Sequence, residues 1–157
     1  MQTFLCEMPY QGAIHTGGAL IVLLFVPAIE HLDYKRLGKQ RIEARTIYDI
    51  NTGANKDWDN PGAWANHPAV KMWKGYENTL ALYHDTCLMV WEYKGYKNNM
   101  PRLNDYTFNN IIIPDWYTID LVNSHRSNLL RKDPVFYGQY RWDVPDNLPY
   151  VWGQGKS

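Results

Sequence analysis

The longest regular pattern in this chain lies between Pro68 and Gly95, and it sets the class of fold that the rest can adopt. Apolar side chains recur there every three or four residues, which is the spacing of one face of an α-helix. The residues of this stripe are Met72, Tyr76, Leu80, Tyr83, Cys87 and Val90. Pro68 suits the first turn and Asn66 or His67 the N-cap. The pattern predicts one helix of about 26 residues whose apolar stripe is core.

A second helix is predicted from Pro27 to about Ile50, and five cations in it surround one carboxylate, Glu43. The cations are Lys35, Arg36, Lys39, Arg41 and Arg45. Helical spacing places Gln40 and Glu43 on the basic side. The residues expected on the opposite, buried side are Leu37, Ala44, Ile47 and Tyr48. This pattern fits either a solvated helix with ordinary ion pairs or a surface for a polyanion. In either case the cations are expected to favour the ionised form of Glu43.

A third helix is expected to begin near Trp116 or Asp120 and to break or restart at Asp133–Pro134. A second basic cluster lies on this helix and consists of Arg126, Arg131 and Lys132. The tail that follows is rich in aromatic residues and proline, so it is expected to cross the helices in extended form. The tail side chains able to stack on bases of a distorted duplex are Tyr137, Tyr140 and Trp142, and core packing is the alternative role for them.

Length and composition favour a single mainly α-helical domain over residues 1–157, a compact bundle with long loops and an extended C-terminal tail. Cys6 and Cys87 are far apart and lack metal-ligand spacing, so we expect no disulfide, no metal and no cofactor. The same usage of cysteine favours a cytoplasmic setting. Sixteen basic and sixteen acidic residues cancel, so a surface for nucleic acid requires their uneven distribution.

An apolar run from Ala19 to Val26 ends at Pro27. A bilayer-spanning helix needs about 20 apolar residues, so no membrane partner is expected. The run is predicted to be a buried segment, with a membrane or partner contact as the alternative. A monomer is the expected state.

One kind of chemistry requires only an amine and a carboxylate. An α-amino group has a pKa of about 7.7–8.0, so roughly a tenth of it is neutral and nucleophilic at pH 7. Gln2 is too bulky for the methionine before it to be removed, so the amine is expected on Met1. Met1 and Glu43 together would make an imine-forming site.

Several blocks of the sequence resemble a known family. They are Met-Gln-Thr-Phe-Leu at 1–5, Leu-Asp-x3-Leu-Gly-Lys-Gln-Arg-x-Glu at 32–43, Asn-His-Pro-Ala-Val-Lys-Met-Trp-x-Gly-Tyr-Glu at 66–77, Lys-Gly-Tyr at 94–96, His-Arg-Ser-x-Leu-Leu-Arg-Lys-Asp-Pro at 125–134 and Val-Pro-Asp-x-Leu-Pro-Tyr-Val-Trp at 144–152. As a set they resemble the phage and actinobacterial proteins grouped with pyrimidine-dimer DNA glycosylases of the endonuclease V type. A phage-encoded protein would act in the host cytoplasm.

The resemblance implies a compact all-α enzyme that flips a nucleotide out of the duplex and attacks C1′ with its N-terminal amine. The strand is then cut by β-elimination through a Schiff base. Counting from the Leu-Asp pair, the essential glutamate of the family falls on Glu43. The basic residues near it are represented by Arg41 and Arg45, although their register is shifted by one position. Residues 6–28 look like an insertion between the nucleophile and the glutamate.

The function expected from the sequence is that of a DNA repair glycosylase with AP-lyase activity on damaged double-stranded DNA. The catalytic residues would be Met1 and Glu43. The candidate DNA contacts are Arg36, Lys39, Arg41, Arg45, His67, His125, Arg126, Arg131 and Lys132. Two alternatives remain: a non-catalytic phage DNA-binding or anti-defence protein, and an interaction protein that uses the apolar run.

Overall fold

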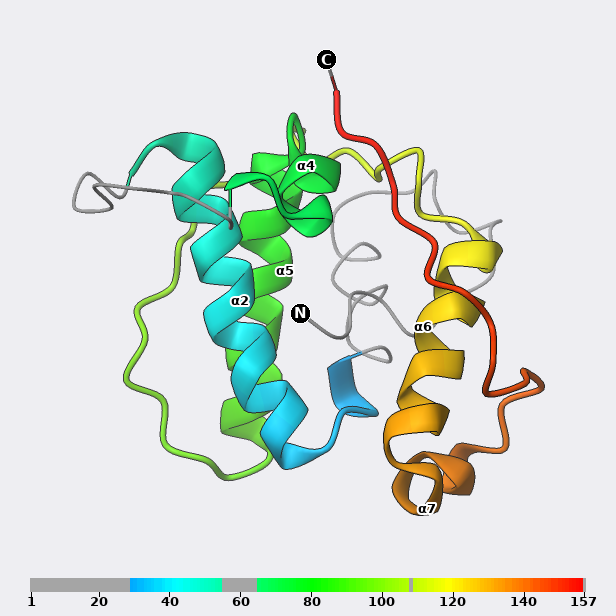
Figure 1. Ribbon diagram of the computed structural model, residues 1–157. Coiled ribbons are helices and arrows are strands. Elements are labelled where there is room, and N and C mark those ends of the chain that lie inside the picture. Colours follow the sequence, from blue (N-terminus) through cyan, green and yellow to red (C-terminus); the bar gives the residue numbers. More distant parts are fainter. Residues whose placement is uncertain (1–28, 55–64, 108, 157) are drawn as a thin grey trace.

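Figure 1 shows a computed structural model of the chain, which describes residues 29–54, 65–107 and 109–156. These residues form helices and no β-strand, which confirms the predicted mainly α fold. The helices are α2 (Tyr34–Thr52), α4 (Pro68–Trp73), α5 (Glu77–Tyr93), α6 (Ile119–Lys132), α7 (Pro134–Tyr137) and the short 3-10 helix η2 (Gly138–Tyr140). None of the helices in the described ranges is long and apolar enough to cross a bilayer. The apolar run at 19–26 and the proposed insertion at 6–28 lie outside the described residues.

Helix α2 starts later in the chain than its sequence pattern predicts. The chain first makes a turn in which the Leu32 amide donates to the Ile29 carbonyl at 3.1 Å. Asp33 then caps the helix, its carboxylate accepting the Arg36 amide at 3.4 Å. The prediction of one continuous helix from Pro27 is therefore wrong, because the chain leaves the helix at residues 31–33 and a local cap at Asp33 begins α2. Pro27 itself lies outside the described residues. The placement of Gln40 on the basic side is also wrong, since its side chain is buried.

The single helix predicted from Pro68 to Gly95 is in fact two helices, α4 and α5. Gly75 separates them in a left-handed backbone conformation with φ +87°, which residues other than glycine rarely adopt. His67 caps α4 as predicted, because its Nδ1 accepts the Ala69 amide at 3.1 Å. All six residues of the apolar stripe are buried, so its assignment to the core is confirmed.

Helix α2 packs along α5, and Trp91 of α5 lies at the centre of the contact. The Trp91 ring stacks on Tyr34 with centroids 5.2 Å apart. Gly38 of α2 lies against the same ring, where a Cβ would be in ordinary contact at 3.5 Å. The Arg41 guanidinium completes the contact at 3.8 Å from the ring centroid. This packing fixes the rotation of α2, and with it the directions in which its charged residues point.

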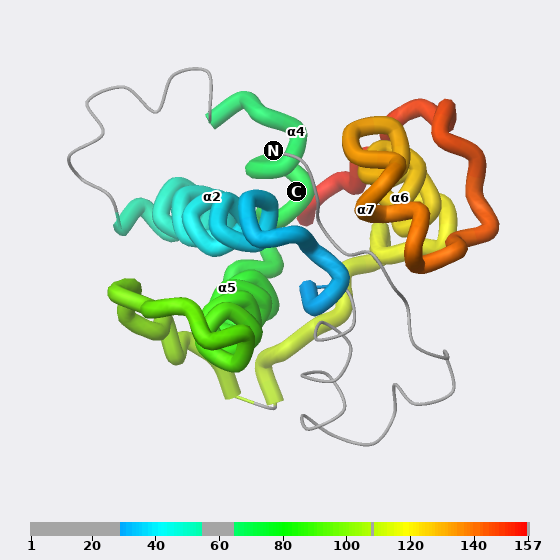
Figure 2. Tube along the Cα trace, turned by 90° about the horizontal axis from the view of Figure 1, so that it is seen from below, coloured from blue at the N-terminus to red at the C-terminus, as the bar shows by residue number. Residues whose placement is uncertain are grey.

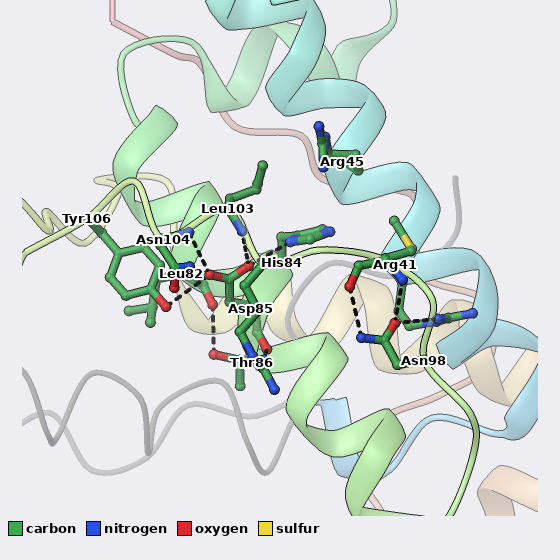
Figure 3. A network of polar contacts seen from close by, with 12 residues as sticks. Arg41, Arg45, Leu82, His84, Asp85, Thr86, Asn98, Leu103, Asn104 and Tyr106 are labelled. Carbon is green, nitrogen blue, oxygen red and sulfur yellow. Dashed lines mark hydrogen bonds and ion pairs between the residues drawn. The ribbon is translucent and has the colours of Figure 1, made fainter.

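A buried carboxylate, Asp85, fastens the segment after α5 back onto that helix (Figure 3). It accepts the amides of Leu103 and Asn104 at 2.8 and 2.9 Å, and the Tyr106 hydroxyl at 3.0 Å. His84 Nδ1 lies 2.9 Å from the same carboxylate. Burial alone would raise the pKa of Asp85, but these hydrogen bonds hold it below the usual value. The network occupies the side of α5 that carries the long 94–107 segment.

The C-terminal tail crosses α6 and ends against α4 (Figures 1 and 2). Ser127 and Ser124 of α6 accept the tail amides of Leu148 and Val151 at 2.9 and 3.0 Å. Further on, the Lys156 amide donates to the Lys74 carbonyl at 2.8 Å. The tail therefore connects the half of the molecule that contains α6 and α7 to the half that contains α2, α4 and α5.

Gly153 tests this arrangement of the tail. A Cβ at this position would lie 2.1 Å from Cγ of Trp116, a buried residue. Gly153→Ala should therefore destabilise the fold by about 1–3 kcal/mol through overpacking. The loss would be measured as a fall of several degrees in Tm.

Gly138→Ala is the matched control, because Gly138 has helical dihedral angles and open space at its Cβ. That change should be neutral or stabilise by about 0.4–1 kcal/mol. Equal Tm values for the Gly153→Ala and Gly138→Ala proteins would mean that the tail does not lie against Trp116 in solution.

Candidate active site and nucleic-acid interface

Glu43 lies half-buried on the flank of α2 that faces Lys132, at the end of α6. Lys39, one turn before it on α2, also acts on its charge. Arg36 and Lys39 in turn act on the charge of Lys132. We call these four residues, Glu43, Arg36, Lys39 and Lys132, the Glu43 cluster. They come from two helices that are far apart in the sequence. Lys39 and Lys132 act directly on the Glu43 carboxylate, and Arg36 acts on Lys132.

The pKa of Glu43 is raised above the usual value. Burial is the main cause, since it disfavours the charged form, and nearby positive charges that include Lys39 and Lys132 only partly oppose it. The expectation that the cations would favour the ionised form overall is therefore wrong in its net direction. The number of cations along α2 is visible in the sequence, whereas the desolvation of one flank is not.

The pKa of Lys132 is lowered, first by burial and then by repulsion from Arg36, Lys39 and Arg131, while Glu43 acts in the opposite direction. Arg36 is itself held by Asp33, with Nη1 3.1 Å from the carboxylate. The cluster thus concentrates positive charge that its single glutamate does not balance. Such a surface attracts a polyanion.

Arg41 and Arg45 do not belong to the Glu43 cluster. Arg41 is two residues from Glu43, which on a helix is a rotation of about 200°. Its guanidinium lies over Trp91 and donates to Asn98 Oδ1 at 3.4 Å. Arg45, one turn after Arg41, pairs with Asp49 at 3.0 Å. Arg41 is therefore held by Trp91 and Asn98, and Arg45 by Asp49 of its own helix.

The remaining basic candidates have different surroundings. His67 caps α4, and burial lowers its pKa. His125 is buried under Tyr150 and Trp152, and burial lowers its pKa to about 4, so its ring is neutral at pH 7. Arg126 lies over the Trp142 ring at 5.3 Å. Arg131 Nη1 donates to the Asp146 carbonyl at 2.8 Å and so holds the tail. Their contacts with DNA stay predictions.

The three aromatic residues proposed for base stacking pack on one another. Tyr137 is fully buried, and its hydroxyl donates to the Asp33 carboxylate that caps α2. Its ring is stacked on Trp142 at 5.9 Å, and Tyr140 stacks on Trp142 at 5.3 Å. Tyr140 and Trp142 remain partly exposed at the edge of this cluster. Tyr137 therefore positions α7 against the start of α2, and only the other two rings reach the surface.

Met1, the other proposed catalytic residue, lies outside the described residues. The described segments contain no group of three or more side chains able to hold a metal ion.

Three lysines that the sequence analysis did not select gather beside the end of the tail, and they are Lys71, Lys74 and Lys156. They are spread over 86 positions of the chain, so only the fold reveals that they are neighbours.

The fold and the Glu43 cluster thus define a helical protein with a half-buried glutamate on a basic surface. Residues 21–104 match the protein family described as pyrimidine dimer DNA glycosylase, and the chain belongs to this family. The match includes α2, α4, α5 and Glu43, whereas α6 and the tail follow it. No curated protein and no solved structure matches the chain significantly.

The raised pKa of Glu43 makes a prediction about stability. A carboxyl group whose pKa is higher in the folded state binds protons more tightly there, so its contribution to stability is greatest at low pH and is lost as pH rises through the folded pKa. Glu43→Gln removes the charge and should raise Tm by a few degrees at pH 7. The difference from the wild type should shrink as pH falls toward and below 4.5, the ordinary value for glutamate.

Thermal melts of both proteins between about pH 3.5 and about pH 7.5, a range that reaches below the ordinary glutamate value of 4.5, would measure this difference. A Glu43→Gln protein that is less stable than the wild type at pH 7 would show that the cations, and not burial, dominate the environment of this carboxylate.

Proposed function

We propose that this protein is a DNA repair glycosylase with AP-lyase activity, which acts on pyrimidine dimers in double-stranded DNA through an N-terminal amine and Glu43. Membership of the pyrimidine dimer DNA glycosylase family supports a DNA glycosylase. The observation that carries the assignment of the site is the position of Glu43: a half-buried carboxylate within the matched residues, next to Lys39 and Lys132.

The cations of the Glu43 cluster would hold the phosphates on either side of the lesion. Lys39 and Lys132 are exposed on two helices, so they can contact a backbone that passes between α2 and α6. Arg36, which Asp33 holds, adds positive charge beside Lys132. Sequence-independent contacts of this kind position a duplex while the reaction is directed at one nucleotide. Because the damaged base must leave the stack, the enzyme would bind it flipped out.

In the proposed reaction the neutral amine of Met1 attacks C1′ as the bond from C1′ to the base breaks, and the base leaves with the electron pair. Loss of a proton from nitrogen and opening of the sugar give an imine. Removal of a C2′ proton then expels the 3′ phosphate, which cuts the strand. Glu43 in its ionised form would stabilise the positive charge on the sugar and on the protonated imine. Its raised pKa also suits it to carry a proton between these steps.

Glu43→Gln tests this role, because it keeps the size of the side chain and removes its charge. The variant should bind a dimer-containing duplex as well as the wild type does. Its single-turnover rate of strand cleavage should fall by about 10²- to 10⁴-fold, the usual contribution of an acid–base group. Binding would be measured by fluorescence anisotropy and cleavage on denaturing gels.

Glu92→Gln is the matched control, since Glu92 is an exposed glutamate near the end of α5, where it accepts from Asn98 and Arg102. The Glu92→Gln protein should cleave the duplex at the wild-type rate. Wild-type cleavage by the Glu43→Gln protein would exclude Glu43 from the reaction. Absence of cleavage by the wild type itself would favour a non-catalytic DNA-binding protein.

A further inference from the structure

The end of the tail and α4 form an open groove of about 470 Å³ at the end of the molecule farthest from α7 (Figure 1). Lysines from three places reach it: Lys71 within α4, Lys74 at its C-cap and Lys156 in the tail. Trp152 forms part of one wall. We call this the lysine groove.

Close backbone packing builds this groove. The Lys156 amide donates to the Lys74 carbonyl at 2.8 Å. Gly155 allows the tail to approach α4, because a Cβ there would lie 2.3 Å from the Lys71 carbonyl oxygen and 2.6 Å from that of Lys74. The Lys156 ammonium lies 5.0 Å from the centre of the Tyr76 ring. These contacts hold the three lysines at one place and do not neutralise their positive charges.

The charge of the lysine groove is not neutralised within the described part of the chain, where none of its three lysines forms an ion pair. The nearby carboxylate of Glu77 accepts the Gly75 amide at 3.0 Å. A site for a small anion usually has several buried donors that converge on one point. The lysines here are exposed and line an open groove, which suits the separate phosphates of a polyanion.

We propose that the lysine groove binds the sugar–phosphate backbone of duplex DNA at a distance from the lesion. The tail runs along α6 from Arg131 to the groove, so the Glu43 cluster and the groove lie near opposite ends of this helix. A helix of 14 residues is about 21 Å long. At about 3.4 Å per base pair, the groove would contact phosphates about six base pairs from the damaged nucleotide.

This inference extends the proposed function, but its test requires no catalysis. Lys71→Gln and Lys74→Gln would be compared with the wild type for binding to an undamaged 25-base-pair duplex, by anisotropy over a series of salt concentrations. Each variant should reduce the slope of log K against log salt by about 0.9, which corresponds to one phosphate contact. The double variant should reduce it by about 1.8.

Lys97→Gln is the control with the same loss of charge. Lys97 is exposed on the 94–107 segment, on the opposite side of α2 and α5 from α6 in Figure 1. The Lys97→Gln protein should show the same slope of log K against log salt as the wild type. Circular dichroism melts would verify that all variants are folded.

A wild-type slope in the double variant would overturn the proposal, and so would an equal loss of slope in Lys97→Gln. Neither outcome depends on the proposed activity, which Glu43→Gln tests separately. If the double variant loses slope while Glu43→Gln retains full cleavage, the lysine groove is a DNA contact in a protein that is not the proposed glycosylase.

Discussion

The packing of α2 on Trp91 is the constraint on which the rest of the site depends. It fixes the rotation of a helix that carries cations on nearly all sides. Arg41 is used to cover the Trp91 ring and Arg45 to pair with Asp49, so both are occupied on one flank. The opposite flank retains Glu43 and Lys39 and meets Lys132 from α6. A run of charges that is continuous in the sequence is in this way divided between a flank held by internal contacts and a flank that the proposed function assigns to DNA.

The second consequence of this geometry is electrostatic. The positive charges of Lys39 and Lys132 would by themselves lower the pKa of Glu43, yet burial between α2 and its neighbours raises it. A buried carboxylate whose pKa is raised lowers the free energy of unfolding at neutral pH. It also binds a proton more readily than an exposed glutamate does. Perturbed carboxyl groups of this kind are typical of active sites. The arrangement therefore gives Glu43 a physical reason to be reactive that its sequence position alone does not provide.

Most of the helices could be predicted, because burial repeats every three or four residues and the apolar stripe of α4 and α5 preserves that period. The break at Gly75 could not, since the close approach that accompanies it comes from the tail, where Lys156 lies 81 positions further along the chain. The position of Arg41 away from Glu43 could not be predicted either, because its partners, Trp91 and Asn98, lie 50 and 57 positions further along the chain. The lysine groove combines Lys71 and Lys74 of α4 with Lys156 of the tail, so no local pattern in the sequence indicates it.

The central claim, that an N-terminal amine works beside Glu43, can be tested by trapping the imine. The protein would be incubated with a duplex that contains one abasic site, reduced with sodium borohydride and digested, and the peptide bonded to DNA identified by mass spectrometry. The account predicts a covalent adduct on the α-amino group of Met1, which acetylation of that amine abolishes. No adduct, or an adduct on Lys39 or Lys132, would contradict it.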